Sequence, residues 1–185
     1  MGMMFGSAAS AVVSILQYFS NESMLRSFVI WTMGSLGSVT GLQIWYFAAL
    51  AILGLIIALL LVRPLNVISL GENYARNLGV KVGFVRFLVF VSTSLLAGAT
   101  TAFCGPIGFI GIAVPHIVRM IFRSSNHTVL VPATILMGAI VLLICDIISQ
   151  FPGMSFTLPI NSIAALMGIP IVIYVVIKNK RFSEM

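Results

Sequence analysis

Charged residues are scarce in this chain of 185 residues. Only 8% of the residues are charged and 60% are hydrophobic, whereas a soluble domain carries about 25% charged residues. So few charges cannot cover a globular surface in water. The composition therefore excludes a soluble enzyme, a disordered tail and a nucleic-acid-binding module. It predicts an all-α, polytopic membrane protein whose surface faces lipid, because a backbone in lipid must satisfy its own hydrogen bonds.

Residues that commonly carry chemistry are scarce as well. The chain has two cysteines, Cys104 and Cys145, which lie in or beside apolar runs without metal-ligand spacing, so buried and unreactive thiols are expected. It has two histidines, too few for a histidine-rich metal site. The sequence contains no G-x-x-x-x-G-K-[ST] or H-E-x-x-H pattern and no G-x-S-x-G pattern. An enzyme is therefore not expected, nor is a bound metal or cofactor.

Six apolar blocks are present instead. One helical span needs about 20 residues, so six would use roughly 120. The spans are expected at about 3–19, 44–62, 85–103, 106–122, 129–149 and 159–177. The first block is rich in small residues, which favours close packing by another helix. The second is expected to close at Arg63-Pro64, and residues 24–33 are expected to form a short interfacial helix.

The basic residues agree with six spans. Nine of the ten fall on one side of such a topology, and only Arg26 falls on the other. The nine are Arg63, Arg76, Lys81, Arg86, Arg119, Arg123, Lys178, Lys180 and Arg181. Because lysine and arginine accumulate in cytoplasmic loops, this side is expected to be cytoplasmic, together with both termini.

The longest expected inner loop, residues 63–84, carries a helix signal. Ser69 and Glu72 have the spacing of a capping box. Leu70, Tyr74 and Leu78 then recur every four residues as one apolar stripe. With Gly79 suited to the position after a helix end, a helix is predicted over residues 70–78. The stripe fits either packing on the protein's own helix ends or lipid, or docking of a cytoplasmic partner.

A second stretch, residues 104–119, combines glycines and prolines. Gly105, Gly108 and Gly111 are three residues apart and are expected to lie near one helix face, which allows close backbone approach. Pro115 removes a backbone donor and can kink the helix. Irregular helices in membranes occur where they pack in protein or line a cavity. Tight packing and the lining of a pathway are therefore both open.

Three polar residues lie within apolar blocks. His116 and Arg119 share a face near the inner end of the fourth block, where local hydrogen bonding and snorkelling to the headgroups are the expected roles. Asp146 lies within a turn of the outer end of the fifth block. An intramembrane acid is a functional candidate by default, but acceptance of hydrogen bonds from neighbouring helix ends is favoured here.

Four stretches together resemble the FecCD-like permeases of iron–siderophore, haem and cobalamin ABC importers. They are LRSFVIWTMGSL (25–36), LGENYARNLGV (70–80), GPIGFIG running into VPHIVR (105–119), and LPINSIAALMGIP (158–170). Their order and approximate spacings are those of the family. The resemblance covers nearly the whole chain and matches the last six of the family's ten spans. About four N-terminal spans are therefore expected to be missing.

The resemblance implies both partners and site residues. Family permeases work in pairs, bind two P-loop ATPase subunits, and receive cargo from an extracytoplasmic substrate-binding protein. By this resemblance, the ATPase-coupling residues are Leu70, Gly71, Glu72, Tyr74, Ala75, Leu78 and Gly79. Those near the translocation path are Gly105, Pro106, Gly108, Phe109, Gly111, Pro115, His116 and Arg119.

The expected function is that of a permease subunit in a bacterial inner membrane, moving an iron complex such as a siderophore, or haem or cobalamin, into the cytoplasm. ATP hydrolysis would take place on the partner chain. The alternative is a helical membrane protein that acts as an assembly or structural partner without transporting anything. Binding of an ATPase subunit distinguishes the two.

Overall fold

The computed structural model describes residues 2–37, 39–150 and 158–183. These residues form eight helices joined by short loops, without a strand in the described ranges. The helices are α1 (Gly2–Tyr18), α2 (Glu22–Met33), α3 (Leu42–Ser69), α4 (Glu72–Asn77), α5 (Val82–Cys104), α6 (Ile110–Phe122), α7 (His127–Ser149) and α8 (Ile160–Ser183). The all-helical fold class predicted from composition is confirmed.

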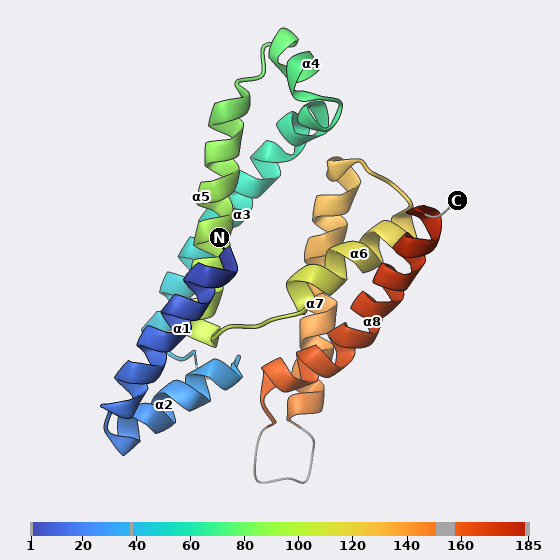
Figure 1. Cartoon of the computed structure of the whole chain (residues 1–185). Helices are drawn as coiled ribbons and strands as arrows, with labels where there is room; N and C mark the ends of the chain where they lie inside the picture. Colours follow the sequence, from blue (N-terminus) through green and yellow to red (C-terminus); the bar gives the residue numbers. More distant parts are fainter. Residues whose placement is uncertain (1, 38, 151–157, 184–185) are drawn as a thin grey trace.

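The helices form two groups (Figure 1). In the first group α3 and α5 pack along each other, and the short helix α4 joins them at one end. In the second group α6, α7 and α8 pack together. An extended segment leads from the end of α5 into α6, and α3 also contacts α7. Helix α2 lies at the end of the molecule opposite α4.

Three helices are long and apolar enough to cross a membrane among the described residues, namely α3, α5 and α7. They coincide with the expected second, third and fifth spans. Three shorter apolar helices, which are α1, α6 and the Ile160–Pro170 part of α8, coincide with the other expected spans. The count of six spans therefore remains a prediction. Helix α2 coincides with the expected short helix at 24–33.

Two predicted helix boundaries are wrong. Helix α3 does not close at Arg63-Pro64 but continues through Pro64 to Ser69. A proline inside a helix removes one backbone donor, and packing of α3 along α5 and α4 holds the remaining turns together. The fourth apolar block begins its helix at Ile110 rather than at Pro106, because Gly105 has a φ of 83° and Phe109 a φ of 61°. Both conformations interrupt a right-handed helix.

Close backbone approach explains how α3 and α5 pack. Gly54 of α3 is buried, and a Cβ at this position would lie 2.8 Å from Leu96 Cγ of α5. The Ser92 hydroxyl, also buried, donates a hydrogen bond of 2.8 Å to the Gly54 carbonyl oxygen. Small residues at helix interfaces in membranes permit this combination of close packing and interhelical hydrogen bonding.

The second group has an apolar core of its own. Val114 and Val118 of α6 pack with Leu130 of α7. Cys145 of α7 packs with Ile163 and Ala164 of α8. Both Cys104 and Cys145 are free and buried, as their apolar surroundings predict.

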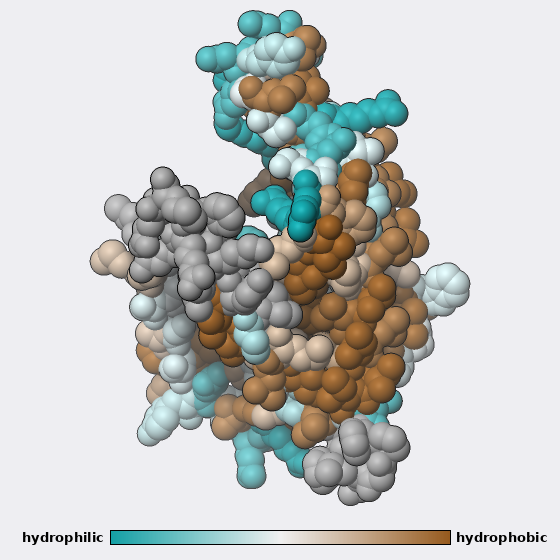
Figure 2. All heavy atoms as spheres, turned by 90° about the vertical axis from the view of Figure 1, so that its right-hand side faces the viewer, coloured by the Kyte–Doolittle hydropathy of each residue, from teal (hydrophilic) through white to brown (hydrophobic). Residues whose placement is uncertain are grey.

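Helix α1 has no such core. None of its residues is buried, so the close helix partner expected from its small residues is not supplied by the described part of this chain. Large apolar side chains are exposed over much of the remaining surface. Figure 2 shows these hydrophobic residues over the middle of one face, with hydrophilic residues gathered towards its upper and lower ends. That distribution is what a bilayer requires.

Candidate functional site

The loop between α3 and α5 projects beyond the bundle, and residues 70–80 are called the tip here (Figure 1). Helix α4 within it has six residues, Glu72–Asn77, so the predicted helix over 70–78 is too long at both ends. Leu70 closes α3 and Leu78 closes α4. Gly71 lies between the two helices with a φ of 123°, a conformation that only glycine adopts without strain.

The predicted capping box is also wrong. Ser69 is still the last residue of α3, and its hydroxyl donates to the Asn66 carbonyl oxygen at 2.7 Å. It is therefore unable to cap α4, whose first turn has Gly71 as its N-cap without a side-chain hydrogen bond. The expected role of Gly79 is confirmed. Gly79, with a φ of 81°, and Val80 donate to the carbonyls of Arg76 and Ala75, which is the Schellman pattern of a helix end.

The predicted apolar stripe on the tip faces outward. The side chains of Leu70, Tyr74 and Leu78 are 70%, 54% and 57% exposed. Ala75 is completely buried on the opposite side, together with Val82 and Val85 in the first turn of α5. Ala75 thus packs the tip against α5, while the three large apolar side chains of the stripe are exposed. This exposure excludes packing of the stripe on the chain's own described helix ends, and leaves contact with lipid and docking of a partner as its predicted roles.

Charges hold the tip in place. The Glu72 carboxylate pairs with Arg86 of α5 and lies 3.9 Å from Arg76 one turn along α4. These groups are about half exposed, so each pair contributes at most about 1 kcal/mol. The Glu72–Arg86 pair mainly orients the tip, since it connects the six-residue helix α4 to the 23-residue helix α5.

At the other end of α5, residues 105–109 form an extended connection called the crossing here. The 23 residues of α5 separate tip and crossing by about 34 Å. Gly105, Pro106 and Gly108 lie in the crossing, Phe109 is its last residue and the N-cap of α6, and Gly111 lies within α6. The three glycines therefore do not share one helix face, and that prediction is wrong because Gly105 leaves the helix with a positive φ.

Two helices distant in sequence, α2 and α8, contact the crossing closely. The amide of Ser35, just after α2, donates to the Cys104 carbonyl oxygen at 2.9 Å. A Cβ at Gly105 would overlap the Trp31 carbonyl oxygen and lie 3.0 Å from Gly34 Cα. From α8, the Asn161 side chain accepts a hydrogen bond of 3.1 Å from the Gly108 amide. A Cβ at Gly168 would lie 2.7 Å from Phe109 Cβ.

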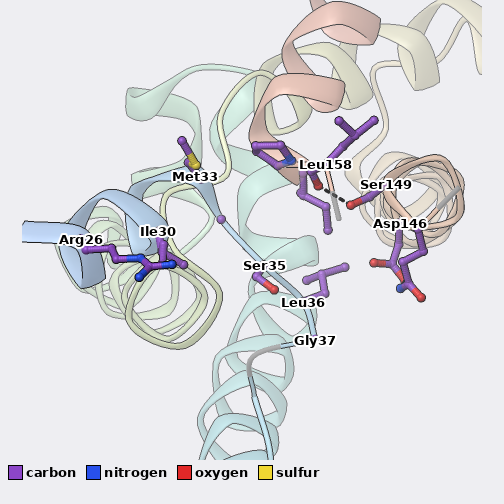
Figure 3. A pocket seen from close by; sticks show the side chains of 13 residues that line it. Arg26, Ile30, Met33, Ser35, Leu36, Gly37, Asp146, Ser149 and Leu158 are labelled. Atoms are coloured by element: carbon purple, nitrogen blue, oxygen red, sulfur yellow. Dashed lines mark hydrogen bonds between the residues drawn. The ribbon is translucent and has the colours of Figure 1, made fainter. Parts of the chain in front are cut away.

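A cavity of about 780 Å³ lies beside the crossing, between α2, α7 and the start of α8. Figure 3 shows Arg26 of α2 on one side and Asp146 and Ser149 of α7 on the other. The Ser149 hydroxyl donates to the Leu158 carbonyl oxygen. The volume lies in the range of small-molecule sites, and the cavity carries charged groups of both signs.

Among the described residues Asp146 has a structural contact, but it is with the end of its own helix α7 and not, as predicted, with a neighbouring helix end. Its carboxylate accepts a hydrogen bond of 2.8 Å from the Gln150 side chain, and its carbonyl accepts one from the Gln150 amide. Residues 151–157, between α7 and α8, lie outside the described residues.

The remaining candidates lie on α6. Pro115 is inside the helix, His116 is half-buried, and Arg119 is exposed. Pro115 and Arg119 line a second cavity of about 300 Å³ between α3, α5, α6 and α7. Within the described ranges, no three His, Cys, Asp or Glu residues come close enough to hold a metal ion.

Several residues of these regions were not predicted as site residues. Arg86, Asn161 and Gly168 act on partners more than ten residues away. The same is true of Asn66, whose amide bonds with residues about 60 positions later. No local pattern identifies such contacts, because each depends on how two helices meet.

The comparisons with known proteins agree with this architecture. The sequence model of the FecCD transport family matches residues 1–178. The vitamin B12 import system permease protein BtuC of Citrobacter koseri is 38% identical over 180 residues, covering 97% of this chain and 54% of that protein. BtuC of Salmonella typhimurium is also 38% identical, with 55% of its length covered.

A solved structure is similar as well. It shows an inward-facing conformation of a metal-chelate type ABC transporter, with a TM-score of 0.83 and 36% sequence identity. The match covers 96% of this chain and 57% of that one. The chain thus spans little more than half the length of these relatives. On the family match and the shared fold, this chain belongs to the FecCD transport family.

Proposed function

We propose that this chain is part of the permease subunit of an ABC importer that brings an iron complex, as a siderophore or haem, or else cobalamin, into the cytoplasm. Membership of the FecCD family supports the transport class. The relatives are named for vitamin B12 import and for metal-chelate transport, and both describe bulky metal complexes. One observation of this chain carries the proposal, which is the projecting tip with its three exposed apolar side chains.

The tip serves as the docking element for a P-loop ATPase subunit. Leu70, Tyr74 and Leu78 offer an apolar surface that water does not favour, and helix faces of this kind bind in grooves of partner proteins. ATP binding closes the ATPase pair, moves the tip, and favours one conformation of the permease through contacts that differ between the two states. The permease itself makes no covalent change in its cargo.

The membrane orientation follows from charge. Arg63, Arg76, Lys81 and Arg86 lie on or near the tip, and by the positive-inside rule this supports a cytoplasmic position for the tip. Both termini are then cytoplasmic, and the membrane is the bacterial inner membrane. The crossing and the 780 Å³ cavity face outward, towards a substrate-binding protein that delivers the cargo. Arg26 is the cationic residue of this chain available there.

A second permease subunit completes the pathway. Helix α1 exposes its small residues, which lie between Gly2 and Ser14, and such surfaces allow helices in lipid to pack closely. The pair of permeases would enclose the cargo between them.

Copurification and uptake test the proposal. The permease is produced with a tagged ATPase subunit and reconstituted with its binding protein. We expect the ATPase to copurify and radiolabelled ferric siderophore, haem or cobalamin to enter vesicles only with ATP. Leu78→Asp should abolish both, while Phe84→Asp, an exposed apolar residue of α5 outside the tip, should retain ATPase binding. Gly71→Asp tests docking less cleanly, because the φ of Gly71 also strains any other residue.

The result that contradicts the proposal is equally defined. If the wild-type protein accumulates in the membrane but retains no ATPase subunit, transport is the wrong function. The protein would then be a structural or assembly partner.

A further inference from the structure

The Asn66 side chain connects the two helix groups. It lies on α3, three residues before the end of that helix. Its Oδ1 accepts a hydrogen bond of 2.7 Å from the backbone amide of His127, the first residue of α7. Its Nδ2 donates to Asn126 Oδ1 at 2.7 Å and to Thr128 Oγ1 at 3.1 Å. These four residues are called the Asn66 junction.

The junction uses the whole bonding capacity of one amide. A carboxamide offers one acceptor oxygen and two N–H donors. Oδ1 also lies 2.8 Å from His127 Nδ1. Because an amide oxygen only accepts, that ring nitrogen carries the hydrogen. Aspartate in this position would lose both donors, and leucine would lose every bond.

The junction also caps α7. The Asn126 side chain accepts from the Thr128 amide at 2.9 Å, while Asn66 satisfies the amide before it. The first turn of α7 therefore obtains one of its capping bonds from a different helix group. In the part of the chain that the structure describes, all side-chain hydrogen bonds between α3 and α7 involve Asn66.

Packing around the junction is open. The 300 Å³ cavity between the two groups is lined by His127 and Leu130 of α7 and by Leu55 and Ala58 of α3. Two packed helices transmit displacement to each other through close van der Waals contacts, and a cavity between them removes such contacts. Next to that cavity, the directional hydrogen bonds of Asn66 are the firm connection between α3 and α7.

We propose that Asn66 is a positioning residue that transmits movement of the tip to the group α6–α8. This rests on the proposed function. The tip is continuous with α3 through Gly71 and is paired to α5 through Glu72 and Arg86, so its displacement moves α3 and α5 together. The Asn66 junction then carries α7 along, whereas without it the two groups would slide across the cavity.

The test measures cargo taken up per ATP hydrolysed, in vesicles containing the complete importer. For Asn66→Leu we expect normal copurification of the ATPase, continued ATP hydrolysis, and a fall of about tenfold in the uptake ratio. Asn21→Leu is the matched control, because Asn21 precedes α2 without a side-chain cap bond, and its ratio should not change. A wild-type ratio in Asn66→Leu would overturn the proposal.

A cysteine pair keeps the test decisive if Asn66→Leu fails to accumulate. Asn66→Cys combined with His127→Cys replaces the hydrogen bonds by a bond that an oxidant forms and a reductant breaks. We expect a low uptake ratio when reduced and recovery of about fivefold or more when oxidised. The single Asn66→Cys variant should keep the same low ratio under both conditions. Oxidised and reduced forms of the pair with equal ratios, or cysteines that do not crosslink, would overturn the proposal. Loss of ATPase binding by the wild-type protein would instead refute the proposed function.

Discussion

The tip and the crossing, at opposite ends of α5, are constructed in opposite ways. The tip exposes large apolar side chains on and beside a helix of six residues, and Glu72 forms ion pairs at its surface. At the crossing, backbone packs against backbone, and Gly105 leaves no room for a Cβ beside Trp31 and Gly34. We therefore expect the tip to keep its fold when an exposed side chain is removed, and the crossing to lose stability when a side chain is added at Gly105.

The largest effect should come from adding a methyl group to the crossing. Gly105→Ala forces a Cβ against the Trp31 carbonyl at a φ of 83°. Strain and overpacking together should lower the free energy of unfolding by about 2–6 kcal/mol. Thermal unfolding in detergent measures this. Gly98→Ala on α5 is the control, because no atom lies within 4 Å of a Cβ there, and it should leave stability unchanged or slightly higher. Equal stabilities would mean that the crossing is not tightly packed.

The next largest effect separates folding from binding at the tip. Tyr74→Ala removes a side chain that is 54% exposed, so the unfolding temperature should hardly change. Binding of the ATPase subunit should weaken by about 2 kcal/mol, as for an aromatic residue at the centre of an interface. Affinity measurement with Asn73→Ala as the neighbouring control checks this. A large loss of stability in Tyr74→Ala would show that side chains of the tip contribute to folding, as the packing of the crossing does.

A smaller effect is expected from one hydrogen bond of the crossing. Asn161→Ala leaves the Gly108 amide without the acceptor that lies 3.1 Å away. An unsatisfied donor at a half-buried site should cost about 1–3 kcal/mol of unfolding free energy. Ser162→Ala, next in sequence and exposed, should cost less. Comparable losses in both variants would contradict the role given to Asn161.

The smallest effect belongs to the ion pairs of the tip. Glu72→Gln removes the charge that holds Arg86 and Arg76. Because these groups are about half exposed, stability should fall by no more than about 1 kcal/mol. The difference from wild type should shrink as salt is added, since salt screens surface charges. Thermal unfolding at low and high salt measures both. A difference that grew with salt would exclude an electrostatic cause.

How much of this could be predicted depends on whether a feature is local. The apolar blocks predicted where α1, α3, α5, α7 and α8 lie, because hydropathy is a property of consecutive residues. The prediction failed at Ser69, where a capping pattern occurs inside the end of another helix. It failed again at Gly105–Gly111, where the φ of Gly105 is set by its approach to Gly34. Gly34 and Gly105 are too far apart in the sequence for a local pattern to include both.

The candidate site divides in the same way. The stripe of Leu70, Tyr74 and Leu78 could be found by its period, although the helix beneath it is shorter than predicted. The Asn66 junction could not, because it joins residues 60 and 61 positions apart. A lone asparagine near a helix end gives no indication of its partner.

Helix α1 has a consequence for how the protein is put together. Its Ser7 and Ser14 hydroxyls donate to carbonyls one turn earlier, at 3.0 and 2.9 Å, so these polar groups are satisfied within the helix itself. A helix of this kind can insert into a bilayer as a stable single helix before it associates with a neighbouring helix. Biogenesis can thus separate insertion of α1 from assembly, and the order in which its neighbours are made need not match the order in which they meet.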